Sequence, residues 1–160
     1  ARARSAPQPL ELSRAGESPA AFTGRVYSKA DMRRRLALAM LGDEAYAEVN
    51  SAWLRVWYPA FRRELLRMGV TNWDRRFDCN RFAEIYTGLA QVNFFRQTFH
   101  HPTDAKALAV GQFWYVRDRG GPHAIVQALT ERGPIFIDPQ TGEELHLSPT
   151  ERKSAYFQVF

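Results

Sequence analysis

Cysteine occurs only once in this sequence of 160 residues, so the chain cannot form an internal disulfide and its fold does not require an oxidising compartment. No stretch approaches the roughly 18–20 consecutive apolar residues that cross a bilayer, and no hydrophobic segment of the secretory-signal type is present. We therefore expect no membrane span, and a protein that is cytoplasmic or is delivered as part of a larger protein. The sequence also has no internal repeat.

Apolar and aromatic residues are abundant enough for a packed globule. They include eleven Phe, six Tyr and four Trp, and the apolar share is 45%, which argues against disorder. The net charge of +5 comes almost entirely from arginine and admits an anionic partner such as nucleic acid. No nucleic-acid-binding motif accompanies the arginines, so solvated helix faces are the preferred interpretation.

The chain divides into an N-terminal arm and one domain. Residues 1–24 are rich in Arg, Ala, Ser and Pro without periodicity, which is typical of a flexible arm or linker, and residues 25–160 form the domain. Helices are predicted over 28–42, 44–57 and 60–68, the last two separated at a proline. Later segments change to extended patterns bounded by turn residues, which predicts strands over 108–116, 124–129, 135–137 and 154–160. The expected class is α+β, with N-terminal helices packed on a C-terminal antiparallel β-sheet.

Cys79 lies where a polar segment gives way to a run with helical spacing. Apolar residues recur at threes and fours along this run, at Phe82, Ile85, Tyr86, Leu89, Val92 and Phe95. The cysteine therefore stands at the start of a predicted helix, where unpaired backbone N–H groups and the helix dipole favour a thiolate. Because the thiolate is the reactive form of cysteine, this position indicates a nucleophile. A small, buried apolar side chain is the alternative interpretation.

His123 and Asp138 are the polar residues that would complete a site around such a nucleophile. His123 stands at the start of one predicted strand and Asp138 at the end of the next. In an antiparallel hairpin these two positions are neighbours, and a helix packed on the sheet would bring Cys79 to the imidazole. Nucleophilic catalysis by cysteine needs this combination of thiolate, imidazole and orienting carboxylate. The alternatives are a structural histidine and a turn-forming aspartate.

Three short motifs in this part of the chain resemble a known family. They are Phe77-Asp78-Cys79-Asn80-Arg81-Phe82-Ala83, Pro122-His123-Ala124-Ile125-Val126 and Ile137-Asp138-Pro139-Gln140. They are similar to motifs of the papain-like and transglutaminase-like superfamily, and most of all to the proteolytic domain of fungal agglutinins and its bacterial and phage relatives. The resemblance covers residues 77–140. It implies a papain-like fold, with Cys79 as nucleophile, His123 as general base and acid, and Asp138 as the orienting carboxylate.

The sequence departs from this family directly after the cysteine. Relatives carry acidic residues there that are often linked to calcium dependence, whereas this chain has Asn80 and Arg81, so we expect no metal and no cofactor. A side-chain donor to an oxyanion hole would come from Asn72, for which capping of a loop is the alternative role.

The resemblance implies a thiol-dependent hydrolase that cleaves a peptide or amide bond. Its substrate would be a protein, a peptide or a peptidoglycan-like polymer. A transglutaminase or deamidase would use the same three residues, because only the acceptor differs. A different class of function is a non-catalytic interaction module of this fold in a phage or secretion assembly.

Overall fold

The structure is a computed structural model that describes residues 19–36 and 38–160. Eight strands and four helices are defined in this part of the chain. In order they are β1 (Phe22–Ser28), α1 (Lys29–Arg35), β2 (Ala45–Val49), α2 (Ser51–Arg67), α3 (Cys79–Gln97), β3 (Ala107–Leu108), β4 (Val110–Arg117), β5 (Gly121–Thr130), β6 (Gly133–Ile137), β7 (Glu144–Leu145), α4 (Pro149–Lys153) and β8 (Phe157–Val159).

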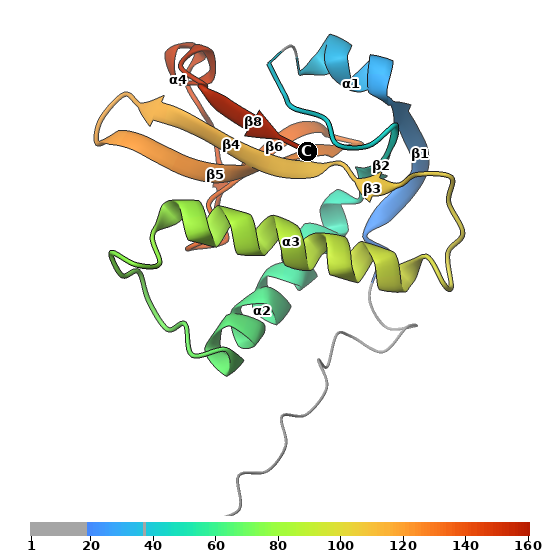
Figure 1. The fold of residues 1–160 in the computed structure, drawn as a ribbon, viewed down its shortest axis with the longest axis horizontal. Coiled ribbons are helices and arrows are strands. Elements are labelled where there is room, and N and C mark those ends of the chain that lie inside the picture. Colours follow the sequence, from blue (N-terminus) through green and yellow to red (C-terminus); the bar gives the residue numbers. More distant parts are fainter. Residues whose placement is uncertain (1–18, 37) are drawn as a thin grey trace, which may run out of the picture.

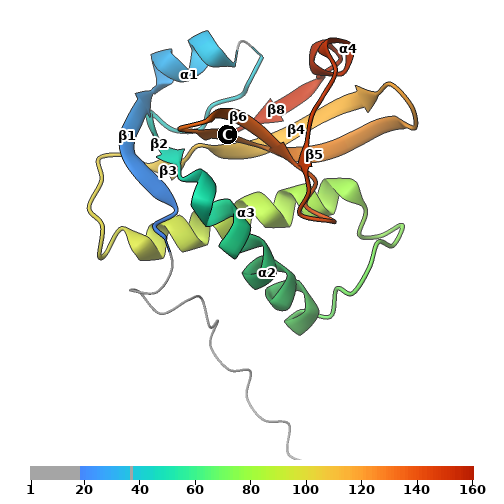
Figure 2. The same ribbon diagram turned by 180° about the vertical axis from the view of Figure 1, so that it is seen from behind.

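All eight strands belong to one mixed sheet. Its main order is β1-β2-β5-β4-β8, with β3 paired to β2 and with β6 and β7 extending from β5. The pairs β2–β3 and β2–β5 are parallel, and the other pairs are antiparallel. Helix α3 runs along the sheet beside β3, β4 and β5, and α2 crosses α3 at an angle (Figures 1 and 2). The N-terminal and C-terminal parts of the chain therefore build the sheet together.

The expected class, a papain-like α+β domain with N-terminal helices packed on a C-terminal antiparallel sheet, is wrong. The sheet is mixed, and it takes β1 and β2 from the N-terminal part that was predicted to be helical or irregular. Residues Tyr46 to Val49 are buried without interruption, because β2 lies inside the sheet between β1 and β5. When such a run continues into the next helix, its apolar residues also fit a helical spacing. A short apolar run therefore does not distinguish a buried strand from a helix.

Several helix boundaries differ from the predicted ones. The Asn50 side chain accepts a hydrogen bond from the backbone N–H of Ala52 at 3.1 Å, which fixes the start of α2 at Ser51. Helix α2 then continues through Pro59, where a break was predicted. Helix α1 begins with a capping box formed by Ser28 and Asp31, but it ends at Arg35, well before the predicted end at residue 42. The helix that begins at Cys79 and the β4–β5–β6 ladder are confirmed.

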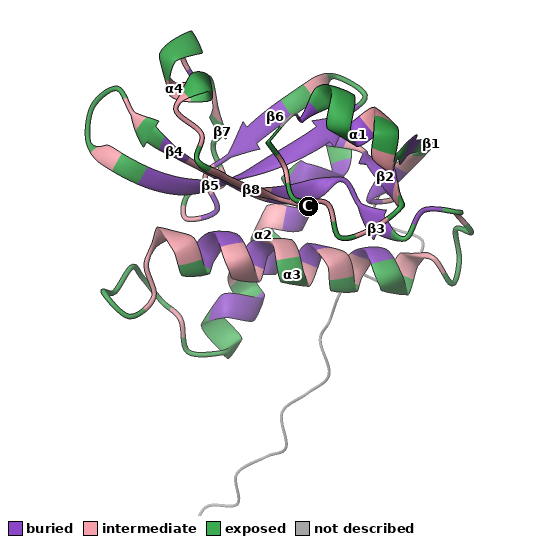
Figure 3. Cartoon of the chain, turned by 45° about the horizontal axis from the view of Figure 1, so that its top comes forward, coloured by how far each residue is buried: buried purple, intermediate pink, exposed green. Residues whose placement is uncertain are grey.

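Each face of the sheet carries an apolar cluster. The larger cluster lies between the sheet and helices α2 and α3, whose buried segments are purple in Figure 3. It includes Trp53, Phe61 and Tyr86. The smaller cluster lies on the opposite face and consists of Phe113, Tyr115, Ile125, Phe136 and Leu147. Side chains alternate between faces along a strand, so neighbouring residues of β5 contribute to different clusters.

The predicted arm only partly overlaps the residues that the structure describes. Residues 1–18 lie outside them, and residues 22–24 belong to β1. No helix in the described part of the chain is both long enough and apolar enough to cross a membrane.

Candidate functional site

The structure brings His123 and Asp138 together. His123 Nε2 lies 3.2 Å from Asp138 Oδ2, and both side chains are largely buried, with 10% and 17% exposed. The two residues lie on β5 and just after β6, where the antiparallel ladder makes them neighbours as predicted. Burial raises the pKa of Asp138, but the bonds from His123 and from the Gln140 N–H outweigh burial and hold that pKa below its usual value.

The structure does not bring Cys79 into hydrogen-bonding contact with His123. It is the first residue of α3, is half-buried against the larger cluster, and has its sulfur 3.6 Å from Asn80 Oδ1. His123 pairs with Tyr115 across β4–β5 and packs edge-on against its ring, so strand alternation places it on the face of the smaller cluster. Within the described residues no hydrogen bond joins the Cys79 sulfur to the imidazole.

Asn72, the predicted oxyanion donor, lies in an exposed bend of the loop between α2 and α3. Across the described part of the chain, its side chain makes no hydrogen bond to Cys79 or to the His123–Asp138 pair. That part of the chain also has no group of three or more His, Cys, Asp or Glu side chains arranged to hold a metal ion.

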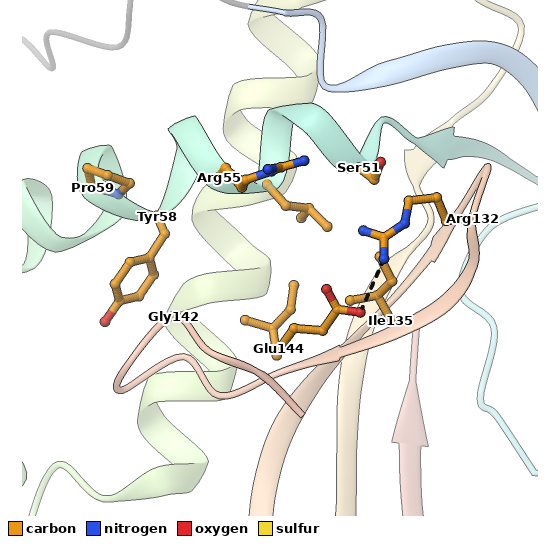
Figure 4. Close-up of a pocket in the computed structure, with 10 residues that line it drawn as sticks. Ser51, Arg55, Tyr58, Pro59, Arg132, Ile135, Gly142 and Glu144 are labelled. Carbon is orange, nitrogen blue, oxygen red and sulfur yellow. Dashed lines mark ion pairs between the residues drawn. The ribbon is translucent and has the colours of Figure 1, made fainter. Parts of the chain in front are cut away.

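A pocket that sequence reasoning missed lies between α2 and the β6–β7 region (Figure 4). We call it the α2–β6 pocket. Its volume is about 670 Å³, and it is lined by Ser51, Leu54, Arg55, Tyr58, Pro59, Arg132, Ile135, Ile137, Gly142 and Glu144. Five of these side chains carry polar or charged groups: the guanidinium groups of two arginines, one carboxylate, one phenol and one hydroxyl. Leu54, Ile135 and Ile137 supply an apolar wall.

The aromatic end of the pocket is held by the turn after β6. The Tyr58 hydroxyl donates a hydrogen bond to the carbonyl of Gln140 at 2.8 Å. Burial raises the pKa of Tyr58, so the phenol stays a neutral donor at physiological pH. Asp138 organises the same turn, because its carboxylate accepts from the Gln140 N–H at 2.9 Å and its carbonyl accepts from the Gly142 N–H at 2.7 Å. Asp138 is therefore a turn-forming residue as well as the partner of His123.

The charged end of the pocket lies near the start of α2. Arg132 Nη2 lies 3.7 Å from Glu144 Oε1, a separation beyond hydrogen-bonding distance. Glu131 turns to the helix instead, where its carboxylate accepts from the backbone N–H of Ser51 at 3.0 Å and from the Ser51 hydroxyl. Arg55 is exposed and forms no ion pair in residues 19–36 and 38–160.

Sequence reasoning missed this pocket because its walls come from two segments that lie far apart in the sequence. The lining residues lie on α2 and on the stretch that runs from the β5–β6 turn through β6 to β7, with no shared motif or spacing. The one local signal was the turn composition of residues 139–142, which predicted a turn but not the ring that packs against it.

Comparisons with known proteins identify similar solved structures and no family. No family model matches the chain, and no curated protein matches it. One similar structure is a complex of PSL1a with E64, with a TM-score of 0.64 and 21% identity over 84% of this chain and 50% of that chain. Another is the Polyporus squamosus lectin bound to the human-type influenza-binding epitope Neu5Aca2-6Galb1-4GlcNAc, with a TM-score of 0.63 and 21% identity over 84% of this chain and 49% of that chain.

These findings bear on the fold, since the identity is low and the chain spans about half the length of the solved proteins it resembles. They contradict the predicted membership in the papain-like cysteine peptidases, because the similar structures are of a lectin and no family model supports a peptidase. The predicted thiol-dependent hydrolase, the transglutaminase or deamidase and the phage or secretion module are likewise unsupported, as is a peptide or peptidoglycan-like substrate.

Proposed function

We propose that this protein binds a saccharide in the α2–β6 pocket. The observation that carries the proposal is the combination of an aromatic ring, an apolar wall and several charged or hydroxyl-bearing side chains around one cavity of about 670 Å³. Ligand sites in proteins are typically concave, largely apolar and furnished with a few convergent polar groups.

The chemistry of the lining fits the two kinds of surface that a sugar offers. The apolar C–H face of a sugar ring would pack against Tyr58 and the aliphatic side chains of Leu54 and Ile135. Its hydroxyl groups would accept hydrogen bonds from Arg132 and donate them to Glu144. The Tyr58 hydroxyl already bonds to Gln140, so the residue offers its ring rather than its oxygen to a ligand.

The similar solved structures support the same class of ligand. One of them is a lectin bound to a sialylated trisaccharide epitope. Because this chain spans only about half of that protein, the likeness supports saccharide binding as a class and leaves the location to the pocket itself.

A glycan array followed by calorimetric titration tests the proposal. Tyr58→Leu removes the ring but keeps an apolar side chain, and we expect it to weaken binding by about two- to tenfold, since one well-packed aromatic contact is worth about 0.5–1.5 kcal/mol beyond the area it buries. The matched control is Tyr156→Leu, which changes a tyrosine that is 57% exposed and does not line the pocket. An array without any bound glycan, or equal affinities for the two variants, would overturn the proposal.

A joint role for Cys79, His123 and Asp138 stays a separate proposal. The His123–Asp138 contact and the position of Cys79 at the start of α3 support it. If the imidazole assists the thiol, His123→Ala should slow the alkylation of Cys79 by iodoacetamide at pH 6 by about tenfold, because only the thiolate reacts. His146→Ala serves as the control, and equal alkylation rates in wild type and His123→Ala would refute a joint role.

A further inference from the structure

We propose that the ligand of the α2–β6 pocket is an acidic saccharide whose carboxylate is bound between Arg55 and Arg132. This inference rests on the proposed function and specifies the class of sugar. It follows from the charges that line the pocket, from their lack of strong partners, and from their positions relative to Tyr58.

The lining carries more positive than negative charge. Arg55 and Arg132 face a single lining carboxylate, that of Glu144. The nearby Glu131 is committed elsewhere, because its oxygens accept hydrogen bonds from the N–H and hydroxyl of Ser51 at the start of α2. Those bonds lower the pKa of Glu131 although its burial raises it. A carboxylate at a helix N-terminus is stabilised by the helix itself, and in the part of the chain that the structure describes Glu131 forms no ion pair with Arg55 or Arg132, although the nearby charge of Arg132 also lowers its pKa.

Neither arginine is strongly paired. The ion pair of Arg132 with Glu144 spans 3.7 Å between partly exposed side chains, and pairs of this kind contribute about 0–1 kcal/mol. Among the residues that the structure describes, Arg55 has no ion-pair partner. A guanidinium group presents two parallel N–H donors that match the two oxygens of a carboxylate, so an acidic ligand would gain charge-assisted bonds here.

The arrangement of the pocket also gives the ligand an orientation. In Figure 4 Tyr58 lies at one end, Ser51 and Arg132 lie at the other, and Arg55 extends along α2 between them. Ser51 and Tyr58 are seven residues apart on one helix, a distance of about 10 Å along its axis, which suits one or two sugar units. The sugar ring would then pack at the Tyr58 end, with its carboxylate at the arginine end.

Titration of paired acidic and neutral ligands tests this inference. The ligands are N-acetylneuraminic acid and the methyl glycoside of glucuronic acid, each beside its own methyl ester, which keeps the ring and removes the charge. We expect at least one acid to bind about tenfold more tightly than its ester, with an affinity that falls as salt rises. Which acid binds more tightly distinguishes a sialic acid from a uronic acid.

Single variants locate the carboxylate. Arg55→Gln and Arg132→Gln should each weaken binding of the acid by about tenfold and weaken binding of the ester much less, because glutamine keeps a hydrogen-bond donor but not the charge. Glu144→Gln should strengthen binding of the acid, because it removes a like charge from the pocket. Arg96→Gln, which neutralises an arginine in the last turn of α3, is the matched control and should have no effect.

The outcomes separate the inference from the function on which it rests. If acids and esters bind equally and the arginine variants behave like wild type, the acidic ligand is refuted while saccharide binding stands. If no acid, ester or neutral sugar binds, both are refuted. Circular dichroism of each variant confirms that a loss of binding is not a loss of fold.

Discussion

The ring of Tyr58 packs directly on the Cα atom of Gly142. A Cβ atom at position 142 would lie 2.6 Å from Cγ of that ring, closer than non-bonded carbon atoms approach. Gly142 also has φ of 78°, a backbone conformation that side chains disfavour. The turn after β6 and the aromatic end of the α2–β6 pocket therefore depend on a residue without a side chain.

Gly142→Ala should both destabilise the protein and weaken saccharide binding. The strained backbone and the displaced ring together should lower the free energy of unfolding by about 2–4 kcal/mol. Urea unfolding and calorimetric titration measure the two effects. Gly69→Ala is the control, because Gly69 has φ of 87° but nothing within 4 Å of the added Cβ, so it should cost only the backbone strain and leave binding intact. Equal effects of the two substitutions would contradict the packing role of Gly142.

Asp138 should make the stability of the protein fall at acidic pH. Its pKa in the folded state lies below the unfolded value of about 3.9, because bonds from His123 and Gln140 outweigh burial. Its contribution is therefore present above that pH and is lost as the pH falls through the folded-state pKa. We expect Asp138→Asn to be less stable than wild type at pH 7, and the difference to shrink below about pH 4. A difference that stays constant from pH 7 to pH 2 would contradict this assignment.

Tyr27 and the buried Glu48 form a second pH-dependent pair. The Tyr27 hydroxyl and the Thr23 hydroxyl, at 2.9 Å, both donate to the carboxylate of Glu48, which is 4% exposed. Burial and the bond to Glu48 raise the pKa of Tyr27 to about 12. The contribution of the Tyr27 hydroxyl to the free energy of unfolding is fully present below about pH 10. It is lost as the pH rises through about 12.

Tyr27→Phe should lower the free energy of unfolding by about 1–3 kcal/mol at pH 7, since it removes a donor from a buried carboxylate. The loss should diminish as wild type itself weakens above pH 10. Chemical denaturation at pH 7 and pH 11 measures both effects. Tyr156→Phe, at an exposed position, should change neither, and a Tyr27→Phe protein as stable as wild type would refute the role of the pair.

Gly111 in β4 gives a prediction about the C-terminal strand. A Cβ there would lie 2.6 Å from Cδ2 of Phe160, so Gly111→Ala should push the end of the chain away from β4. We expect a loss of about 1–3 kcal/mol in the free energy of unfolding. Gly88→Ala provides the matched comparison, because nothing lies near that position in α3. There alanine should stabilise the helix by about 0.5–1 kcal/mol, so thermal unfolding should shift in opposite directions for the two variants.

Sequence patterns predicted the structure correctly where it depends on residues that are close together along the chain. The apolar spacing after Cys79 predicted α3 from its first residue, and the turn residues between extended segments predicted the β4–β5–β6 ladder. The adjacency of His123 and Asp138 followed from that ladder without any knowledge of the rest of the fold. The same reasoning failed for β2, since its apolar residues fit a helix as well as a strand.

The sequence by itself determined the start of α3, the hairpins of the C-terminal half and the contact between His123 and Asp138, because helical periodicity and antiparallel pairing act between residues close along the chain. Only the tertiary structure decided that β2 joins β5 in parallel, that His123 shares a face with Tyr115, and that α2 and β6 enclose a pocket. These arrangements depend on which distant surfaces bury one another, and burial between distant segments leaves no periodic trace in either segment.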